Sequence, residues 1–168
     1  GHTFGEKVEE VLVEKLVELD GRFTAPENKR EMQDVSFNDD LINIKFGFDK
    51  KGQPNMVAFN RLSTRYLKNE IDSYYIISID GKTNTVTLFD LYQQLPYTNY
   101  NVGTGQVMLK EKQFFSQFDQ KKDYSLSKYT IINTMRQMKL QSHKDHIKLK
   151  EEQLKKSLEL FDKTLSLY

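Results

Sequence analysis

The chain contains no cysteine among its 168 residues. Disulfide bonds and zinc sites built on thiolates are therefore excluded, and a reducing compartment fits this composition. The first residues lack the basic start and the apolar run of a secretion signal, so we expect none. No apolar run approaches the roughly 18 residues that a membrane-spanning helix needs. We therefore expect a cytoplasmic protein without membrane segments.

Internal repeats and low-complexity linkers are also absent, and 38% of the residues are hydrophobic. This length and composition are typical of one globular domain, and we expect residues 1–168 to form it. The formal net charge is only +1, which alone argues neither for nor against nucleic acid. Acids nevertheless dominate residues 6–20, and Lys and Arg dominate residues 136–156. These segments are either two solvated helix faces or an acidic metal end and a basic end that faces phosphate.

Hydrophobic spacing predicts a mixed α/β fold. The predicted helices span residues 5–19, 60–70, 110–118 and 126–167. The predicted strands span residues 31–37, 41–48, 73–79 and 83–91. The polar segment 96–106 is predicted to be a loop. This order favours a single mixed β-sheet flanked by helices, with a long C-terminal helix.

The stretch QDVSFNDDLINIKFGFDK, residues 33–50, has the pattern of a β-hairpin. If residues 38–39 form a two-residue turn, Val35 lies opposite Ile42 and Asp34 lies opposite position 43. Side chains alternate along a strand, so one face carries Val35, Phe37, Ile42, Ile44 and Phe46. The other face carries Asp34, Ser36, Asn43 and Lys45. A slip of one residue would mix the two faces, so the hydrophobic pattern favours this register.

The polar face of the hairpin brings a carboxylate, an amide and an ammonium group together at the end of a sheet. Magnesium binds one or two carboxylates and keeps several waters. A Lys beside the metal can help to neutralise a phosphodiester and to orient a water. The alternative is that Asp34 and Lys45 form a solvated cross-strand pair.

This pattern resembles the PD-(D/E)xK nuclease superfamily, and its organisation resembles a small type II restriction endonuclease. In that family a helix with a Glu precedes a strand with an Asp, and the next hairpin strand carries acid-x-Lys. Asp34 matches the Asp, and residues 43–45 (Asn-Ile-Lys) match the acid-x-Lys. Glu9 in the helical segment GEKVE matches the Glu. The resemblance covers roughly residues 5–80 and implies a restriction-endonuclease-like core with magnesium-dependent, sequence-specific DNA endonuclease activity.

The resemblance also implies a role for each matched residue. Asp34, Asn43 and the carbonyl of Ile44 would bind the magnesium ion. Lys45 would orient or activate the attacking water and stabilise the charge on the phosphate. Glu9 would assist the metal or Lys45 from the helix.

Asn43 stands where the family has a carboxylate, and Gln33 stands where it has Pro. An amide oxygen can coordinate a metal but brings no negative charge. Three explanations remain open. Another acid (Asp39, Asp40 or Glu70) completes the site, or Asn43 is a deliberate inactivating change, or the chain is a degenerate nuclease that only binds. We expect DNA binding with slow or no cleavage, and we expect Asn43→Asp to raise cleavage.

Polar side chains outside the hairpin are candidates for contact with DNA. Arg61 and Arg65 share one face of a predicted helix, which either follows a phosphate backbone or is simply solvated. The segment 96–106 is either a flexible turn or a source of groups that stack on bases or hydrogen-bond to their edges. The candidates for DNA binding are Gln53, Asn55, Arg61, Arg65, Asn99, Tyr100, Asn101 and Gln106.

Apolar residues recur at heptad-like intervals in the last predicted helix. They are Leu140, Ile147, Leu154, Leu158, Phe161, Leu165 and Tyr168. This seam either packs on the chain's own core or pairs with a second subunit, and a nuclease that cuts both strands of a palindrome often works as a two-fold dimer. We expect a homodimer that binds double-stranded DNA. The rival functions are a non-catalytic DNA-binding module and a coiled-coil interaction protein.

Overall fold

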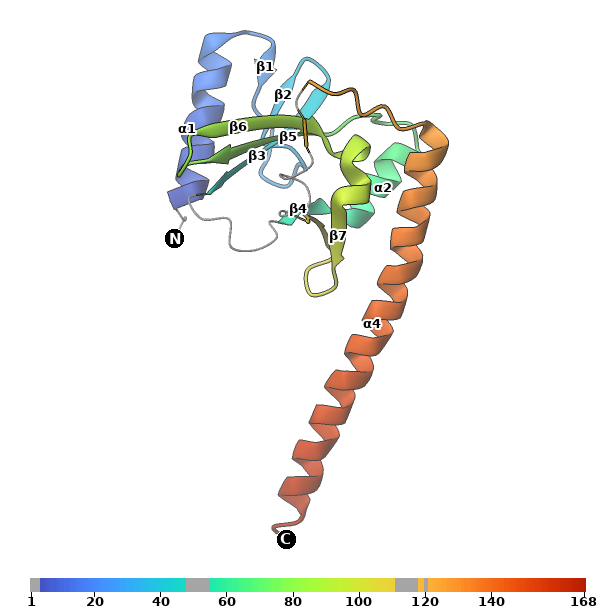
Figure 1. Cartoon of the computed structure of the whole chain (residues 1–168). Helices are drawn as coiled ribbons and strands as arrows, with labels where there is room; N and C mark the ends of the chain where they lie inside the picture. The colour runs from blue at the N-terminus through green and yellow to red at the C-terminus, as the bar shows by residue number, and fades with distance from the viewer. Residues whose placement is uncertain (1–3, 48–54, 111–117, 120) are drawn as a thin grey trace.

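The structure, a computed structural model, describes residues 4–47, 55–110, 118–119 and 121–168. Its body is layered: α1 (Phe4–Leu19) covers one face of a five-stranded sheet, and α2 (Phe59–Leu67) packs against the other face. Helix α4 (Lys128–Leu165) runs beside the body and continues well past it (Figure 1). The mixed α/β class and the long C-terminal helix are confirmed.

The five-stranded sheet has the order β1-β2-β3-β5-β6. Its strands are β1 (Phe23–Thr24), β2 (Val35–Phe37), β3 (Asp40–Gly47), β5 (Tyr75–Asp80) and β6 (Thr85–Asp90). β3 and β5 pair in parallel, and the other neighbours are antiparallel. The hairpin register is confirmed, with Val35 opposite Ile42. Asn38 begins the turn with a φ of 50°, a left-handed conformation that Asn tolerates better than most residues.

The apolar face of the hairpin is buried beneath α1. Val35, Ile42 and Ile44 form a cluster with apolar side chains of α1, among them Leu12 and Leu16. Helical spacing of its apolar residues gives α1 one stripe that can face a sheet. Its exposed side carries Glu6, Glu10, Glu14 and Glu18. Most of the acidic segment is therefore a solvated helix face.

Helix α2 supplies the crossover that the parallel pair β3 and β5 requires. Its Phe59, Leu62 and Tyr66 are buried in a second cluster, on the face of the sheet opposite α1. The predicted helix over residues 60–70 is thus confirmed in kind but ends earlier. Asn69 adopts a φ of 57°, and this left-handed conformation stops the helix.

A second, three-stranded sheet corrects the prediction of a single sheet. In spatial order its strands are β4 (Asn55–Ala58), β8 (Gln106–Leu109) and β7 (Thr98–Asn101), all antiparallel. A 3-10 helix, η1 (Leu91–Tyr97), leads from β6 into β7. The segment predicted to be a loop is therefore largely a hairpin. It forms because Val107 and Leu109 are fully buried in the cluster that contains α2.

The strand predicted over residues 31–37 begins only at Val35, because Met32 is held differently: its carbonyl accepts the hydroxyl of Tyr74. The helix predicted over residues 110–118 falls almost entirely outside the described residues.

Helix α4 begins as predicted, close to residue 126. The hydroxyl of its N-cap, Ser127, accepts the backbone N–H of Thr130 at 3.1 Å. Ile131 and Met135 are buried against the body, whereas every residue from Lys150 onward is exposed. Across the described residues, no helix combines the length and apolarity needed to cross a membrane.

Candidate functional site

Part of one edge of β3 extends beyond its neighbour β2. β2 pairs with only the first three residues of β3, whereas β3 continues beside β5 to Gly47. Beyond the end of β2, two carboxylates occupy the edge. Asp34 accepts the backbone N–H of Ile44 at 2.6 Å, and Glu9 accepts that of Phe46 at 3.2 Å. These contacts satisfy two strand N–H groups that would otherwise lack a partner on this side.

Three elements deliver the side chains that gather at this edge. Asp34 directly precedes β2, Glu9 lies in α1 and Lys45 lies in β3. Groups that bind alternate residues of one strand are about 7 Å apart, which sets the scale of the separation between the two carboxylates. Lys45 is near enough to lower the pKa of both.

Asp34 and Lys45 share the face of the sheet that looks away from α1. Ile42 and Ile44 pack toward α1, so alternation places Asn43 and Lys45 on the other face. Val35 also packs toward α1, which puts the adjacent Asp34 on the same face as Lys45. The predicted alternation along β2 and β3 is therefore confirmed, and the carboxylate of Asp34, just before β2, lies at the strand edge on the N–H of Ile44. Glu9 differs, because it reaches the strand edge from the α1 side.

Burial dominates the electrostatics of both carboxyl groups. It raises the pKa of Asp34, and the N–H of Ile44 and the charge of Lys45 only partly offset the rise. Burial likewise raises the pKa of Glu9 against the lowering effects of the Phe46 N–H and Lys45. Both groups would become easier to ionise beside an added cation. Raised carboxyl pKa values at a shared edge are typical of functional sites, although ion-pair networks also produce them.

The donor set fits a hard divalent cation that retains water. Asp34 and Glu9 offer carboxylate oxygens, and the carbonyl of Ile44 faces the same edge as its N–H, since both groups of an extended residue point the same way. Magnesium is commonly held by only one or two carboxylates. Within the described part of the chain, no three acidic, His or Cys side chains converge as a metal cluster. Water or substrate oxygens would have to complete the coordination.

Glu9 is the acid best placed to stand beside Asp34. Of the alternatives, Glu70 is engaged by Arg65 at 3.1 Å. Asp39 is exposed in the hairpin turn. Asp40 is the first residue of β3, whereas the uncovered part of the strand edge is near its last residues.

Asn43 is held by a structural contact. Only 6% of its surface is exposed, and its amide N–H donates to the carbonyl of Met56 in β4 at 2.6 Å. A carbonyl needs a donor, so the amide nitrogen must face Met56. The contact joins the start of the small sheet to the middle of β3. Asn43 thus lies on the predicted face of the sheet, and its amide nitrogen is hydrogen-bonded to β4.

The two arginines of α2 differ in their surroundings. Both border a cavity of about 370 Å³, which is lined by Glu31, Met32, Gln33, Leu41, Arg61 and Arg65. Arg65 is tied to Glu70 and to the sulfur of Met32. Arg61 is exposed. Gln33 precedes Asp34 in the chain, so this cavity lies beside the segment that leads into β2.

The amides expected to contact bases are largely engaged with one another. The amide of Asn101 donates to Asn55 at 3.1 Å and accepts the N–H of Gly103 at 2.9 Å. The hydroxyl of Tyr100 lies 2.8 Å from Nε2 of His146, which joins β7 to α4. These residues therefore hold the hairpin and the helix together in this structure.

Asn99 and Gln106 are half-buried on the same small sheet, and Gln53 lies outside the described residues. Sequence reasoning missed Tyr74 and the carbonyl of Met56, which border the hairpin face. Tyr74 is fully buried, and burial raises its pKa well above the usual range. Its place in a continuous apolar run was a usable signal, whereas a backbone carbonyl leaves no signal in a sequence.

Comparison with known proteins found no relative of this chain. No protein-family profile and no curated protein matches the chain. The side chains at the β3 edge are therefore the features that bear on function.

Proposed function

We propose that this chain is a magnesium-dependent DNA endonuclease of the restriction type. The observation that carries the proposal is the meeting of Asp34, Glu9 and Lys45 at the open edge of β3. Two carboxylates and an ammonium group at one strand edge suit the hydrolysis of a phosphodiester. The order of helix, hairpin, crossover helix and parallel strand supports the resemblance to the PD-(D/E)xK superfamily.

Each residue has a distinct part in this proposal. Asp34, Glu9 and the carbonyl of Ile44 would hold the magnesium ion, which would supply charge neutralisation and an activated water. Lys45 would stabilise negative charge on the phosphate and orient the attacking water. Asn43 would position β4 through Met56. Asn43 brings no negative charge where the family has a carboxylate, so we expect cleavage to be slow.

The proposed substrate is double-stranded DNA, which a pair of chains would cut on both strands. Arg61 would contact a phosphate near the site, because it is exposed and borders the cavity next to Gln33. A phosphate contact of this kind adds affinity and salt dependence but little sequence preference.

The test compares cutting of supercoiled plasmid by the unchanged chain, Asp34→Ala and Lys45→Ala, with magnesium and without it. We expect both variants to lose cutting and Lys45→Ala to keep DNA binding in a gel-shift assay. Asp39→Ala and Lys82→Ala are matched controls, because both residues are exposed in turns. Equal cutting by Asp34→Ala and the unchanged chain would refute the proposal.

The second candidate is a non-catalytic DNA-binding module. It is favoured by Asn43, which adds no negative charge to the site. In the same assays it predicts a gel shift by the unchanged chain with no cutting at any divalent ion. It also predicts that Lys45→Ala leaves magnesium binding and plasmid integrity unchanged.

A further inference from the structure

An apolar stripe runs along α4 without a partner in the described part of the chain. Its side chains are between 47% and 68% exposed. They are Leu140, Ile147, Leu154, Leu158, Phe161 and Leu165. Tyr168, the last residue of the pattern, lies past the end of the helix. The stripe runs over the 26 residues from Leu140 to Leu165, a rise of about 38 Å along the helix.

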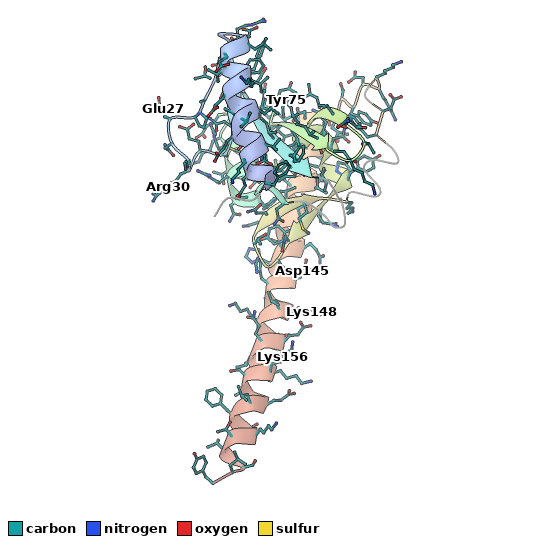
Figure 2. All side chains as sticks on the ribbon, turned by 90° about the vertical axis from the view of Figure 1, so that its left-hand side faces the viewer. Glu27, Arg30, Tyr75, Asp145, Lys148 and Lys156 are labelled. Carbon is teal, nitrogen blue, oxygen red and sulfur yellow. The ribbon has the colours of Figure 1, made fainter. Side chains whose placement is uncertain are left out.

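The stripe faces away from the body. The buried residues of α4 are Ile131, Met135 and Ser142, and they mark the side that packs on the body. Leu140 is two residues from Ser142, which is about 200° around the helix. Figures 1 and 2 show the later turns of α4 projecting clear of the body, with Lys148 and Lys156 on the projecting part. Within the part of the chain that the structure describes, the core therefore does not cover the stripe.

We propose that a second copy of this chain covers the stripe in a parallel, two-stranded coiled coil. Leu140, Ile147, Leu154 and Phe161 are seven residues apart and take the d positions, and Leu158 and Leu165 take a positions. In a parallel pair in register, each of these residues faces its own copy. The apolar positions of the seam are therefore complementary to themselves, whereas Lys144 and Glu151, at the other a positions, each face a like charge.

Charged residues interrupt the stripe at two a positions, and neighbouring side chains offset part of the like-charge contacts in a parallel pair. Glu151 takes an a position, where the neighbouring g position of the partner helix brings Lys150 close to it. Lys155 lies four residues after Glu151 in the same helix, the favourable order for an ion pair. Lys144, at another a position, can extend its ammonium group to solvent beside two helices more readily than among several.

The position of the bodies also favours the parallel arrangement. Each body lies on the side of its α4 opposite the seam, so two bodies at the same end would lie on opposite sides of the pair. An antiparallel pair with Leu154 opposite Leu158 would place Ile147 opposite Leu165. It would leave Leu140 opposite a position past the end of α4.

The oligomeric state of the full chain tests the proposal. We expect sedimentation at micromolar concentration to show a dimer, Leu158→Lys to give a monomer, and Leu160→Lys to remain a dimer. Leu160 is exposed on the same turn but about 200° from Leu158, so it is a matched control. A monomeric unchanged chain, or equal loss of the dimer in both variants, would overturn the proposal. Circular dichroism checks that the variants keep their helix content.

Cross-linking tests the direction of the helices. The chain has no Cys, so a single introduced thiol reports on one position. We expect Ile147→Cys to form a disulfide-linked dimer on oxidation, because its two copies face each other, whereas Glu152→Cys on the outer side should not. A dimer in which Ile147→Cys stays reduced would exclude the parallel arrangement. The pairing does not depend on the nuclease proposal, and Lys45→Ala should dimerise like the unchanged chain.

Discussion

One buried amide, that of Asn43, joins two parts of the chain that are distant in sequence. Its N–H bond to Met56 fastens β4 to β3, and β4 in turn carries the small sheet. A carboxylate at this position would set an oxygen against the carbonyl of Met56 at hydrogen-bonding distance. This contact changes our expectation for Asn43→Asp. The candidate metal site would gain a negative charge, but the fold would lose the hydrogen bond to the carbonyl of Met56.

We predict that Asn43→Asp lowers the free energy of unfolding by about 1–3 kcal/mol at about pH 8. An ionised Asp cannot donate to Met56, whereas a protonated Asp can. Burial would raise its pKa above the unfolded value, so the folded state would take up a proton first as the pH falls. The loss of stability should then shrink toward about pH 5. Denaturant unfolding at both pH values measures the effect.

Asn60→Asp provides the control for Asn43→Asp. Asn60 is exposed on α2, and its side-chain oxygen already accepts from Lys139 at 3.0 Å. A charge there should not reproduce the pH-dependent loss. If Asn43→Asp is as stable as the unchanged chain at both pH values, the bond to Met56 does not constrain this position.

Individual elements differed in how far the sequence could predict them. The hairpin was predictable because Val35, Ile42 and Ile44 alternate with polar residues, and a wrong register would expose them. β1 has two residues, too few to show a period. β4, β7 and β8 have four residues each, and β4 and β7 contain Asn, which is unfavourable in strands. They form because distant segments of the chain supply the buried surface between them.

Asp90 links two elements, and its ionisation should control part of the stability. Its carboxyl oxygen accepts the N–H of Tyr74, before β5, and that of Tyr92, in η1. Burial raises the pKa of Asp90 to about 6, against a value of 3.8 for an ordinary Asp. The folded state therefore binds the proton more tightly than the unfolded state. The contribution of Asp90 to stability should increase as the pH falls from about 7 toward 4.

We predict that Asp90→Asn removes most of this pH dependence and stabilises the protein near neutral pH. The amide oxygen of Asn can still accept both N–H groups, but it carries no charge to bury. The gain should be on the order of 2 kcal/mol above about pH 7 and should vanish toward pH 4. Thermal unfolding across this pH range measures it, with Asp39→Asn in the exposed turn as control. If Asp90→Asn changes the stability by the same amount at every pH, the ionisation of Asp90 does not control this part of the stability.

At the scale of the whole molecule, the candidate site and the apolar stripe of α4 lie on different parts of the structure. The candidate residues at the β3 edge were identifiable because the hairpin is local in sequence and Glu9 follows a helical period. The second sheet was not, because its partners meet only after the chain folds back on itself. The stripe was visible as a heptad pattern, but only the structure shows that it faces away from the body.

Pairing through α4 would place two β3 edges on one assembly, and this has a consequence for the products of cleavage. If both proposals hold, the paired chain should convert supercoiled plasmid to linear DNA with little nicked intermediate. Leu158→Lys should separate the chains but leave each β3 edge intact, so nicked plasmid should accumulate before linear DNA forms. Leu160→Lys should behave like the unchanged chain. A time course on agarose gels measures the ratio of nicked to linear product. If Leu158→Lys is monomeric by sedimentation yet still yields linear DNA directly, a single chain cuts both strands, and pairing through α4 serves another purpose.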